Sequence, residues 1–289
     1  MANDAKRSGK RFIVLLAVAL SLTVLSCVVG YLSLPYPIVL VADTQSEMRQ
    51  LDAAMQAFKA MYGVYPPSKI KLCSNCKDYG AEPLDQASIM ALSRLWPNIG
   101  MFQDIAWAGD GPPVQGEILE GDQCLVFFLG GIPDSAAKEP ACLGFARNGK
   151  NPAQLGDARV GPFFGFDSDR LVKLRGSRFW SYLDRYSTSQ PYAYFSAGNK
   201  KNGYNRFGTS DCSALGVWPY AKSLDPQPDY FNPNTFQLIS AGPDGKFGPG
   251  TALPDGKTWT PQTADQIDPA GRDDLSNFYP MPMGKRTAE

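Results

Sequence analysis

The stretch TQSEMRQLDAAMQAFKAMY, from Thr44 to Tyr62, carries the strongest structural signal in the chain. Its large apolar residues recur at spacings of three and four, which predicts a helix with one apolar face. This face consists of Met48, Leu51, Met55, Phe58 and Tyr62. Thr44 and Glu47 have the spacing of a capping box, in which the two side chains satisfy the first free amides of a helix. We therefore expect an amphipathic helix that starts at Thr44 and packs on a core.

The segment before this helix is free of charged residues from Phe12 to Ala42 and follows four basic residues. As a helix it would exceed the roughly 30 Å hydrocarbon core of a membrane. We predict a transmembrane helix over 12–34, with Pro35 and Pro37 kinking or breaking the chain after it. Basic residues flank such helices on the cytoplasmic side, which places the tail 1–11 in the cytoplasm and the remainder outside.

Two alternatives for the N-terminal segment keep the same orientation of the body. A cleaved signal peptide has a shorter apolar region that ends at small residues. A lipoprotein signal is suggested by Val24-Leu25-Ser26-Cys27, in which Cys27 would be acylated. Each alternative still leaves the rest of the chain extracytoplasmic.

The overall composition excludes several classes of function. The chain has 28 basic and 28 acidic residues, so no net field attracts nucleic acid. It has no histidine, which rules out Ser-His-Asp and Cys-His catalytic sites and histidine-bound zinc. Carboxylate-only catalysis stays open, with Asp167 and Asp169 as its candidates. We assign no catalytic residues and expect a protein that is not an enzyme.

Five of the six cysteines lie in the predicted extracytoplasmic part. In an oxidising compartment, Cys73 and Cys76 are spaced to close a small disulfide loop, and Cys124 could pair with Cys142. Cys212 would then lack a partner. A zinc site with four thiolates is the competing interpretation, but the second CxxC motif typical of such sites is missing.

The rest of the chain predicts a mixture of helices and strands, and therefore the α+β class. Helical spacing occurs in Asp85–Trp96 and in Ser177–Tyr186. The apolar run Cys124–Leu129 fits either a buried strand or a capped helix. Strands are expected at Pro191–Ser196 and Thr235–Ser240, where aromatic and β-branched residues lie between turn-forming clusters.

The C-terminal part is a long segment rich in Gly, Pro and Asp. Its first strand ends in Ser240-Ala-Gly-Pro-Asp244-Gly, and Asp273-Asp274-Leu-Ser-Asn-Phe278 follows about thirty residues later. Calcium takes six to eight oxygen ligands from carboxylates and carbonyls. A bound cation would explain why so long a loop is ordered. A solvated surface loop fits the composition equally well.

Together these features resemble the major pseudopilin of type II secretion and its type IV pilin relatives. The resemblance rests on the uncharged N-terminal segment with prolines after it, the run from Leu51 to Pro66, and the two acidic C-terminal motifs. It implies an amphipathic helix packed on a small antiparallel sheet, followed by a long C-terminal loop. The implied organisation is a cytoplasmic basic tail at 1–11, a transmembrane helix at 12–34, a pilin-like helix at 35–67, an inserted mixed α+β region at 68–234, and a strand with a calcium-type loop at 235–289.

The resemblance also implies a function and a metal site. In that family the C-terminal loop holds calcium, which here points to Asp244 and Asp274 as ligands, helped by Asp273 and by the carbonyls of Leu238 and Ala241. The implied protein is a structural subunit in the inner membrane, with its body in the periplasm or outside the cell. Its partners would be other pseudopilin or secretion-system subunits, including copies of itself.

The chain departs from this family at the site where the N-terminus is normally processed. The family has Gly, then Phe, with Glu at the fifth mature position. Here Gly9 is followed by Lys10 and Arg11 before Phe12, and the apolar segment contains no Glu. The runner-up interpretation is a membrane-tethered extracytoplasmic lipoprotein that acts as a binding protein or as a carboxylate-based enzyme.

Overall fold

The computed structural model describes residues 36–156, 158–186, 189–198, 200–223, 227–248 and 269–284. The chain divides into two units, Met1–Asp43 and Thr44–Glu289, and we call the second unit the body. The predicted basic tail at 1–11 and the predicted transmembrane helix at 12–34 lie outside the described residues.

The described elements follow one another in a mixed order of helices and short strands. The α-helices are α2 (Tyr36–Tyr62), α3 (Pro83–Leu95) and α4 (Gly121–Gly130). The 3-10 helices are Cys76–Asp78, Ser168–Arg170, Ser213–Leu215 and Pro269–Gly271. The strands are β1 (Ile70–Cys73), β2 (Gln115–Leu119), β3 (Phe145–Ala146), β4 (Arg159–Val160), β5 (Leu171–Val172), β6 (Ser181–Tyr182), β7 (Ala193–Ser196), β8 (Ala221–Ser223), β9 (Asp229–Tyr230), β10 (Phe236–Ser240) and β11 (Leu275–Ser276).

The fold-class prediction needs one correction. The body is α+β with small antiparallel sheets, but the prediction also included a transmembrane helix. Among the helices in the described part of the chain, none combines the length and the apolar character that a membrane crossing requires.

Helix α2 begins earlier than the capping signal predicted. It starts at Tyr36 and continues through Thr44, so the expected start at Thr44 is wrong. Pro37 falls in the first turn, where proline costs no hydrogen bond. Thr44 is buried and its hydroxyl has no hydrogen-bond partner among the described residues, while Glu47 bonds to distant side chains. Tertiary contacts have replaced the local cap.

The apolar face of α2 is confirmed by burial. Met48, Leu51, Met55 and Phe58 are each at most 2% exposed, and Tyr62 is half-buried against the Phe58 ring. Burying one such side chain contributes about 1.5–3 kcal/mol to folding. This face therefore fixes the helix to the body far more firmly than helix propensity could.

The sheet at the centre of the body has the order β11–β10–β7 and is antiparallel throughout. Strand β10 lies in the middle, with Phe236 opposite Ser196 on β7 and Ser240 opposite Leu275 on β11. All five residues of β10 are buried, as expected for a central strand covered on both faces. The strands predicted at Pro191–Ser196 and Thr235–Ser240 are thereby confirmed.

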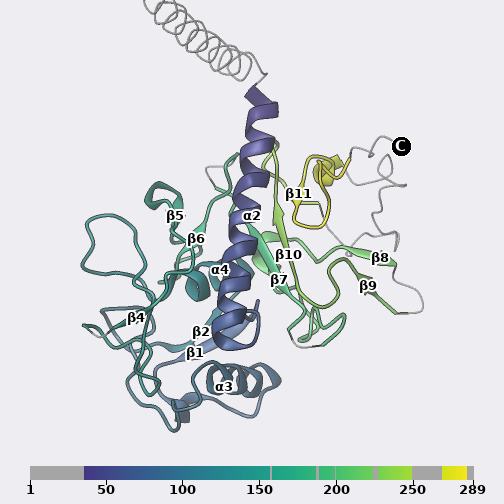
Figure 1. Cartoon of the computed structure of the whole chain (residues 1–289). Helices are drawn as coiled ribbons and strands as arrows, with labels where there is room; N and C mark the ends of the chain where they lie inside the picture. The colour runs from purple at the N-terminus through teal and green to yellow at the C-terminus, as the bar shows by residue number, and fades with distance from the viewer. Residues whose placement is uncertain are drawn as a thin grey trace, which may run out of the picture. The chain divides into compact units, whose positions relative to one another are not determined.

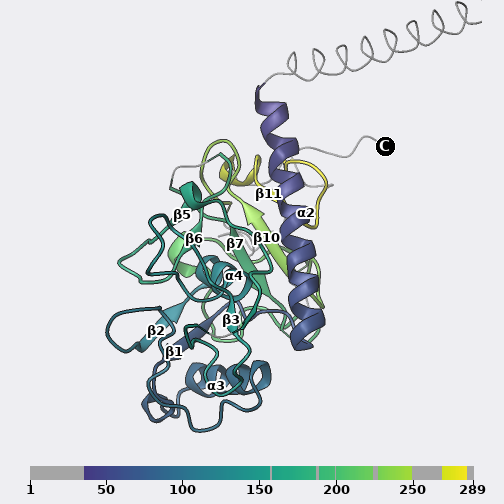
Figure 2. The same ribbon diagram turned by 60° about the vertical axis from the view of Figure 1, so that its left-hand side comes forward.

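One face of this sheet packs beneath the Thr44–Tyr62 part of α2, which runs beside β10 in both views (Figures 1 and 2). Side chains alternate along a strand, so Phe236 and Leu238 share this face. The Phe236 ring lies 5.3 Å from the Tyr65 ring, just after α2. Tyr192, just before β7, donates a 2.7 Å hydrogen bond to Glu47 on α2. The predicted packing of an amphipathic helix on a small antiparallel sheet is therefore present.

The opposite face of the sheet is covered by the C-terminal half of the body. Ile239 lies in an apolar cluster there with Phe195, Tyr220, Tyr279 and Met283. Gln237 also faces this side, and its amide bonds the backbone N–H and C=O of Tyr220. A buried amide satisfied in this way costs little, because its hydrogen bonds to water are replaced.

The region 68–234 is built into the body and shares its sheet. Strand β7 comes from this region and pairs with β10 from the C-terminal part. Helix α4, also from this region, is buried along its whole length. It is capped by Glu120 and Gln123, which decides between the two interpretations of Cys124–Leu129 in favour of a helix. Helix α3 confirms the prediction at Asp85–Trp96 within two residues.

The helix predicted at Ser177–Tyr186 is absent. The segment instead forms β6, whose residues Ser181 and Tyr182 pair with Val172 and Leu171 of β5. The Leu183 N–H donates to the carbonyl of Arg170, far from the carbonyl four residues back that a helix would use. Aromatic side chains at helical spacing here serve tertiary packing, which overrides the local pattern.

Candidate metal site and adjoining groove

The turn after β10 is held in a tight conformation by a glycine. Gly242 has φ of +65°, and a Cβ at this position would lie 2.2 Å from the carbonyl oxygen of Asp273. The Gly245 N–H donates to the Gly242 carbonyl over 3.2 Å. Only glycine permits both the positive φ and the close approach of the second strand. The turn therefore lies directly against the chain that leads into β11.

Two of the predicted ligands, Asp244 and Asp273, are in direct contact where this turn meets the chain before β11. The backbone N–H of Asp244 donates a 2.8 Å hydrogen bond to Oδ2 of Asp273, 29 residues away in sequence. The carboxylate of Asp244 in turn accepts the Lys246 N–H at 2.7 Å. Burial and the nearby Asp244 charge raise the pKa of Asp273, against the opposing effect of its backbone hydrogen bonds. This contact between Asp244 and Asp273, which we call the acidic junction, brings two carboxylates together at one end of the sheet.

Asp274 lies beneath this junction and is fully buried. Its Oδ2 accepts hydrogen bonds from the Gly248 N–H and the Tyr220 hydroxyl, both at 3.0 Å. Its Oδ1 is buried without a hydrogen-bond partner among the described residues. Burial raises the pKa of Asp274 well above its usual value, and the charges of Asp273 and Asp244 add to this. An unpaired buried carboxylate is costly unless a proton or a cation compensates it.

The two predicted carbonyl ligands are placed differently. Leu238 lies within β10, where its carbonyl accepts the Asn277 N–H at 3.2 Å, so it is engaged in the sheet. Ala241 is buried at the end of the strand, next to the turn. The described residues contain no group of three or more His, Cys, Asp or Glu side chains arranged to hold a metal ion. The orphaned oxygen of Asp274 and the adjoining carboxylates suit a cation, but with fewer side-chain ligands than the resemblance implies.

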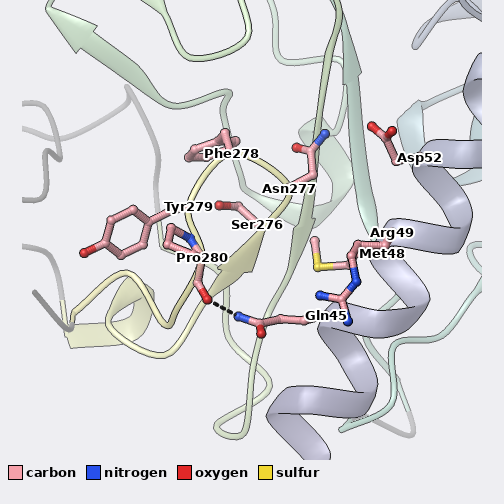
Figure 3. A pocket seen from close by; sticks show the side chains of 9 residues that line it. All are labelled: Gln45, Met48, Arg49, Asp52, Ser276, Asn277, Phe278, Tyr279 and Pro280. Carbon is pink, nitrogen blue, oxygen red and sulfur yellow. Dashed lines mark hydrogen bonds between the residues drawn. The ribbon is translucent and has the colours of Figure 1, made fainter. Parts of the chain in front are cut away.

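Sequence reasoning missed the groups that anchor Asp274 and the groove beside them. Tyr220 and Gly248 have no motif that could have revealed their role. A groove of about 510 Å³ separates α2 from the loop after β11 (Figure 3). Gln45 on α2 bridges it by donating a 2.6 Å hydrogen bond to the Pro280 carbonyl. Its walls are Gln45, Met48, Arg49 and Asp52 on one side and Ser276, Asn277, Phe278, Tyr279 and Pro280 on the other.

The alternative catalytic pair lies elsewhere. Asp167 and Asp169 are both exposed; Asp167 is the N-cap of the 3-10 helix Ser168–Arg170, and Asp169 is its middle residue. The Asp167 side chain accepts the Asp169 N–H at 3.2 Å, as a local cap does. Neither carboxylate lies at the acidic junction or in the groove.

The predicted disulfides are not formed. All five cysteines of the described residues are free, including Cys73, Cys76, Cys124 and Cys142. Cys73 and Cys76 do not meet because Cys76 starts a 3-10 turn and its sulfur lies 3.9 Å from the sulfur of Met101. The Cys124 thiol donates instead to the Leu119 carbonyl within the core.

No protein-family model matches this chain, and neither does any curated protein or any solved structure.

Proposed function

We propose that the chain is a pseudopilin-like structural subunit of a type II secretion or type IV pilus-like apparatus, with its body outside the cytoplasm and its C-terminal turn stabilised by calcium. The observation that carries the proposal is the contact between Asp244 and Asp273 above the buried Asp274, at the end of the sheet that α2 covers. This combination supports the proposal, because the resembled family carries its calcium loop in the corresponding C-terminal segment.

A calcium ion at the acidic junction would stabilise the fold in two ways. Asp244 and Asp273 stand at the two ends of a 29-residue separation, so one ion shared between them closes a long loop. The ion also supplies the positive charge that the orphaned oxygen of Asp274 lacks. Loop closure and charge neutralisation both favour the folded state.

The same segment continues into the groove of Figure 3. Residues 276–280 form one wall of it and begin two residues after Asp274. An ion at the junction therefore also positions this wall.

Calcium should raise the melting temperature of the full-length chain by several degrees over the value in chelator. A ligand at one hundred times its dissociation constant stabilises the folded state by about 2.7 kcal/mol, and each kcal/mol corresponds to about 2–4 °C in a chain of this size. Scanning calorimetry with calcium or EDTA measures this shift. Asp244→Ala combined with Asp274→Asn should remove it, whereas Asp110→Ala, at an exposed carboxylate elsewhere, should leave it intact. Identical melting curves with calcium and EDTA would contradict the proposal.

In chelator, Asp274→Asn should stabilise the chain relative to wild type at neutral pH, and this advantage should shrink as the pH falls. The pKa of Asp274 in the folded state is raised above its ordinary value of 3.8, so the folded state binds this proton more tightly than the unfolded state. Ionised Asp274 thus lowers stability above the raised pKa, and the penalty fades as the pH falls through it towards 3.8. Urea denaturation of both proteins at several pH values measures the difference. A constant difference across the range would show that Asp274 does not titrate in this way.

A further inference from the structure

A second cavity lies on another part of the body, away from the acidic junction. Its volume is about 180 Å³, and it opens between the chain after α2, the outer face of α3 and the segment that leads to Asp211. Cavities of about 150 Å³ accept ligands as large as benzene. A molecule of roughly six to ten non-hydrogen atoms therefore fits this one.

Asp211 forms the polar end of this cavity. It is 5% exposed, and its Oδ2 accepts a 2.6 Å hydrogen bond from the Ser68 hydroxyl. Its Oδ1 is buried and has no hydrogen-bond partner among the described residues. Its backbone carbonyl accepts the Gly121 N–H at 2.7 Å, which fixes the residue in place. Buried acceptors are nearly always satisfied, so this oxygen needs a donor that the described residues do not supply.

Two arginines line the same cavity from different elements. Arg94 projects from the last turn of α3 and makes no hydrogen bond or ion pair within the described part of the chain. Arg206 donates only through Nε, to the Gly203 carbonyl at 3.1 Å, so its two terminal nitrogens stay open among the described residues. The third cation, Lys69, is already bonded to Thr209 and Ser210. The arginines are thus the groups left for an anionic ligand.

The remaining wall is apolar. Val64, Tyr65 and Leu95 are buried beneath it, and Met90 borders it with 65% of its surface exposed. A methionine of this exposure at the rim of a cavity gives an adaptable apolar contact. The lining therefore combines a carboxylate, two guanidinium groups and a hydrocarbon surface, which matches the three parts of an amino acid.

We propose that this cavity binds a small α-amino acid with an apolar side chain, whose ammonium group is paired with the charge of the Asp211 carboxylate and whose carboxylate is held by Arg94 and Arg206. The inference does not depend on calcium or on the proposed role as a subunit. Burial raises the pKa of Asp211, opposed by the Ser68 hydrogen bond and by the charges of Lys69 and Arg206. A bound ammonium adds to this opposition and favours the ionised carboxylate.

The test is titration calorimetry of the full-length chain with three probes of similar shape. L-leucine carries both charged groups, 4-methylpentanoate lacks the ammonium, and 3-methylbutylamine lacks the carboxylate. Each lost group removes charge-assisted hydrogen bonds, so we expect leucine to bind about tenfold more tightly than either analogue. Equal affinity for the three probes, or no leucine binding at millimolar concentration, would overturn the assignment.

Variants locate the binding within the chain. Arg94→Ala removes an exposed side chain that makes no hydrogen bond or ion pair with the described residues. It should weaken leucine binding by about tenfold with an unchanged melting temperature. Asp211→Asn should weaken leucine binding but leave the affinity for 4-methylpentanoate nearly unchanged. Arg147→Ala, at an exposed arginine remote from this lining, and Asp244→Ala, at the acidic junction, should have no effect on leucine. Undiminished leucine binding in Arg94→Ala would refute the proposal.

Discussion

Replacing Glu47 by Ala should lower the free energy of unfolding by about 3–5 kcal/mol. The change removes one partner of a buried ion pair and leaves the other, Arg170, without its counter-charge. The Glu47 side chain is 5% exposed and accepts two hydrogen bonds from Arg170, at 2.6 and 2.7 Å. The hydroxyls of Tyr182 and Tyr192 also donate to it, at 3.1 and 2.7 Å. This carboxylate joins α2 to β6 and to the start of β7, so its loss loosens the helix from the sheet.

The size of the effect follows from what remains after the change. Arg170, whose side chain is 16% exposed, keeps its bond to the Leu183 carbonyl but loses its counter-charge. Glu47→Gln keeps the shape and should fall between wild type and Glu47→Ala. Urea denaturation gives the three values, with a fall in melting temperature of about 10 °C expected for Glu47→Ala. Gln50→Ala, on the exposed side of the same helix, is the control and should change stability by less than about 0.5 kcal/mol.

The pH dependence of this contribution has a defined sign. Burial acts to raise the pKa of Glu47, but hydrogen bonds from Arg170 and Tyr192 outweigh it, so the pKa is lowered from its ordinary value of 4.5. The stability from Glu47 is therefore present above pH 4.5 and is lost as the pH falls through the lowered pKa. If Glu47→Ala were as stable as wild type at neutral pH, the ion pair would have no net role in holding α2.

Replacing Gly131 by Ala should destabilise the body by about 3 kcal/mol or more, because it adds a methyl group where two backbones touch. Gly131 ends α4 with φ of +93°, and a Cβ there would lie 2.3 Å from the backbone of Gly144. The two segments are tied by the Gly144 N–H, which donates to the Gly130 carbonyl at 2.7 Å. No side-chain rotation can relieve such a contact, so the backbones must separate.

Gly156→Ala provides the matched control. Gly156 also has a positive φ, +75°, but a Cβ there would meet no atom within 4 Å. This variant carries only the conformational penalty, about 1 kcal/mol. Denaturation of both variants separates the two effects. Equal losses at the two positions would mean that the contact between Gly131 and Gly144 is not close in solution.

The local pattern of the sequence was sufficient where one face of an element meets the core. The stripe from Met48 to Tyr62 predicted which side of α2 is buried, and the aromatic run at Pro191–Ser196 predicted β7. In both cases the period of the apolar residues equals the period of the backbone. The same reasoning failed at Ser177–Tyr186, since aromatic side chains at helical spacing can also fill a core from an irregular segment.

The acidic junction was predictable only in part. The resemblance predicted that Asp244, Asp273 and Asp274 belong to one site. In the structure, the antiparallel pairing of β10 with β11 brings Asp244 and Asp273 into contact. Nothing in the order of residues could show that Tyr220 holds Asp274, or that the Leu238 carbonyl is engaged in the sheet. Such partners lie far apart in sequence and share no motif.

The amino-acid order alone therefore determined the α+β class, the buried face of α2 and the two long strands of the central sheet, because each depends on a repeat within a few residues. Tertiary structure alone decided that α2 begins before Thr44, that Glu47 pairs with Arg170, and that Asp211 lines a cavity together with two arginines. These outcomes depend on which distant segments meet. Burial then sets whether a polar group finds a partner in the chain or is left to bind one from outside.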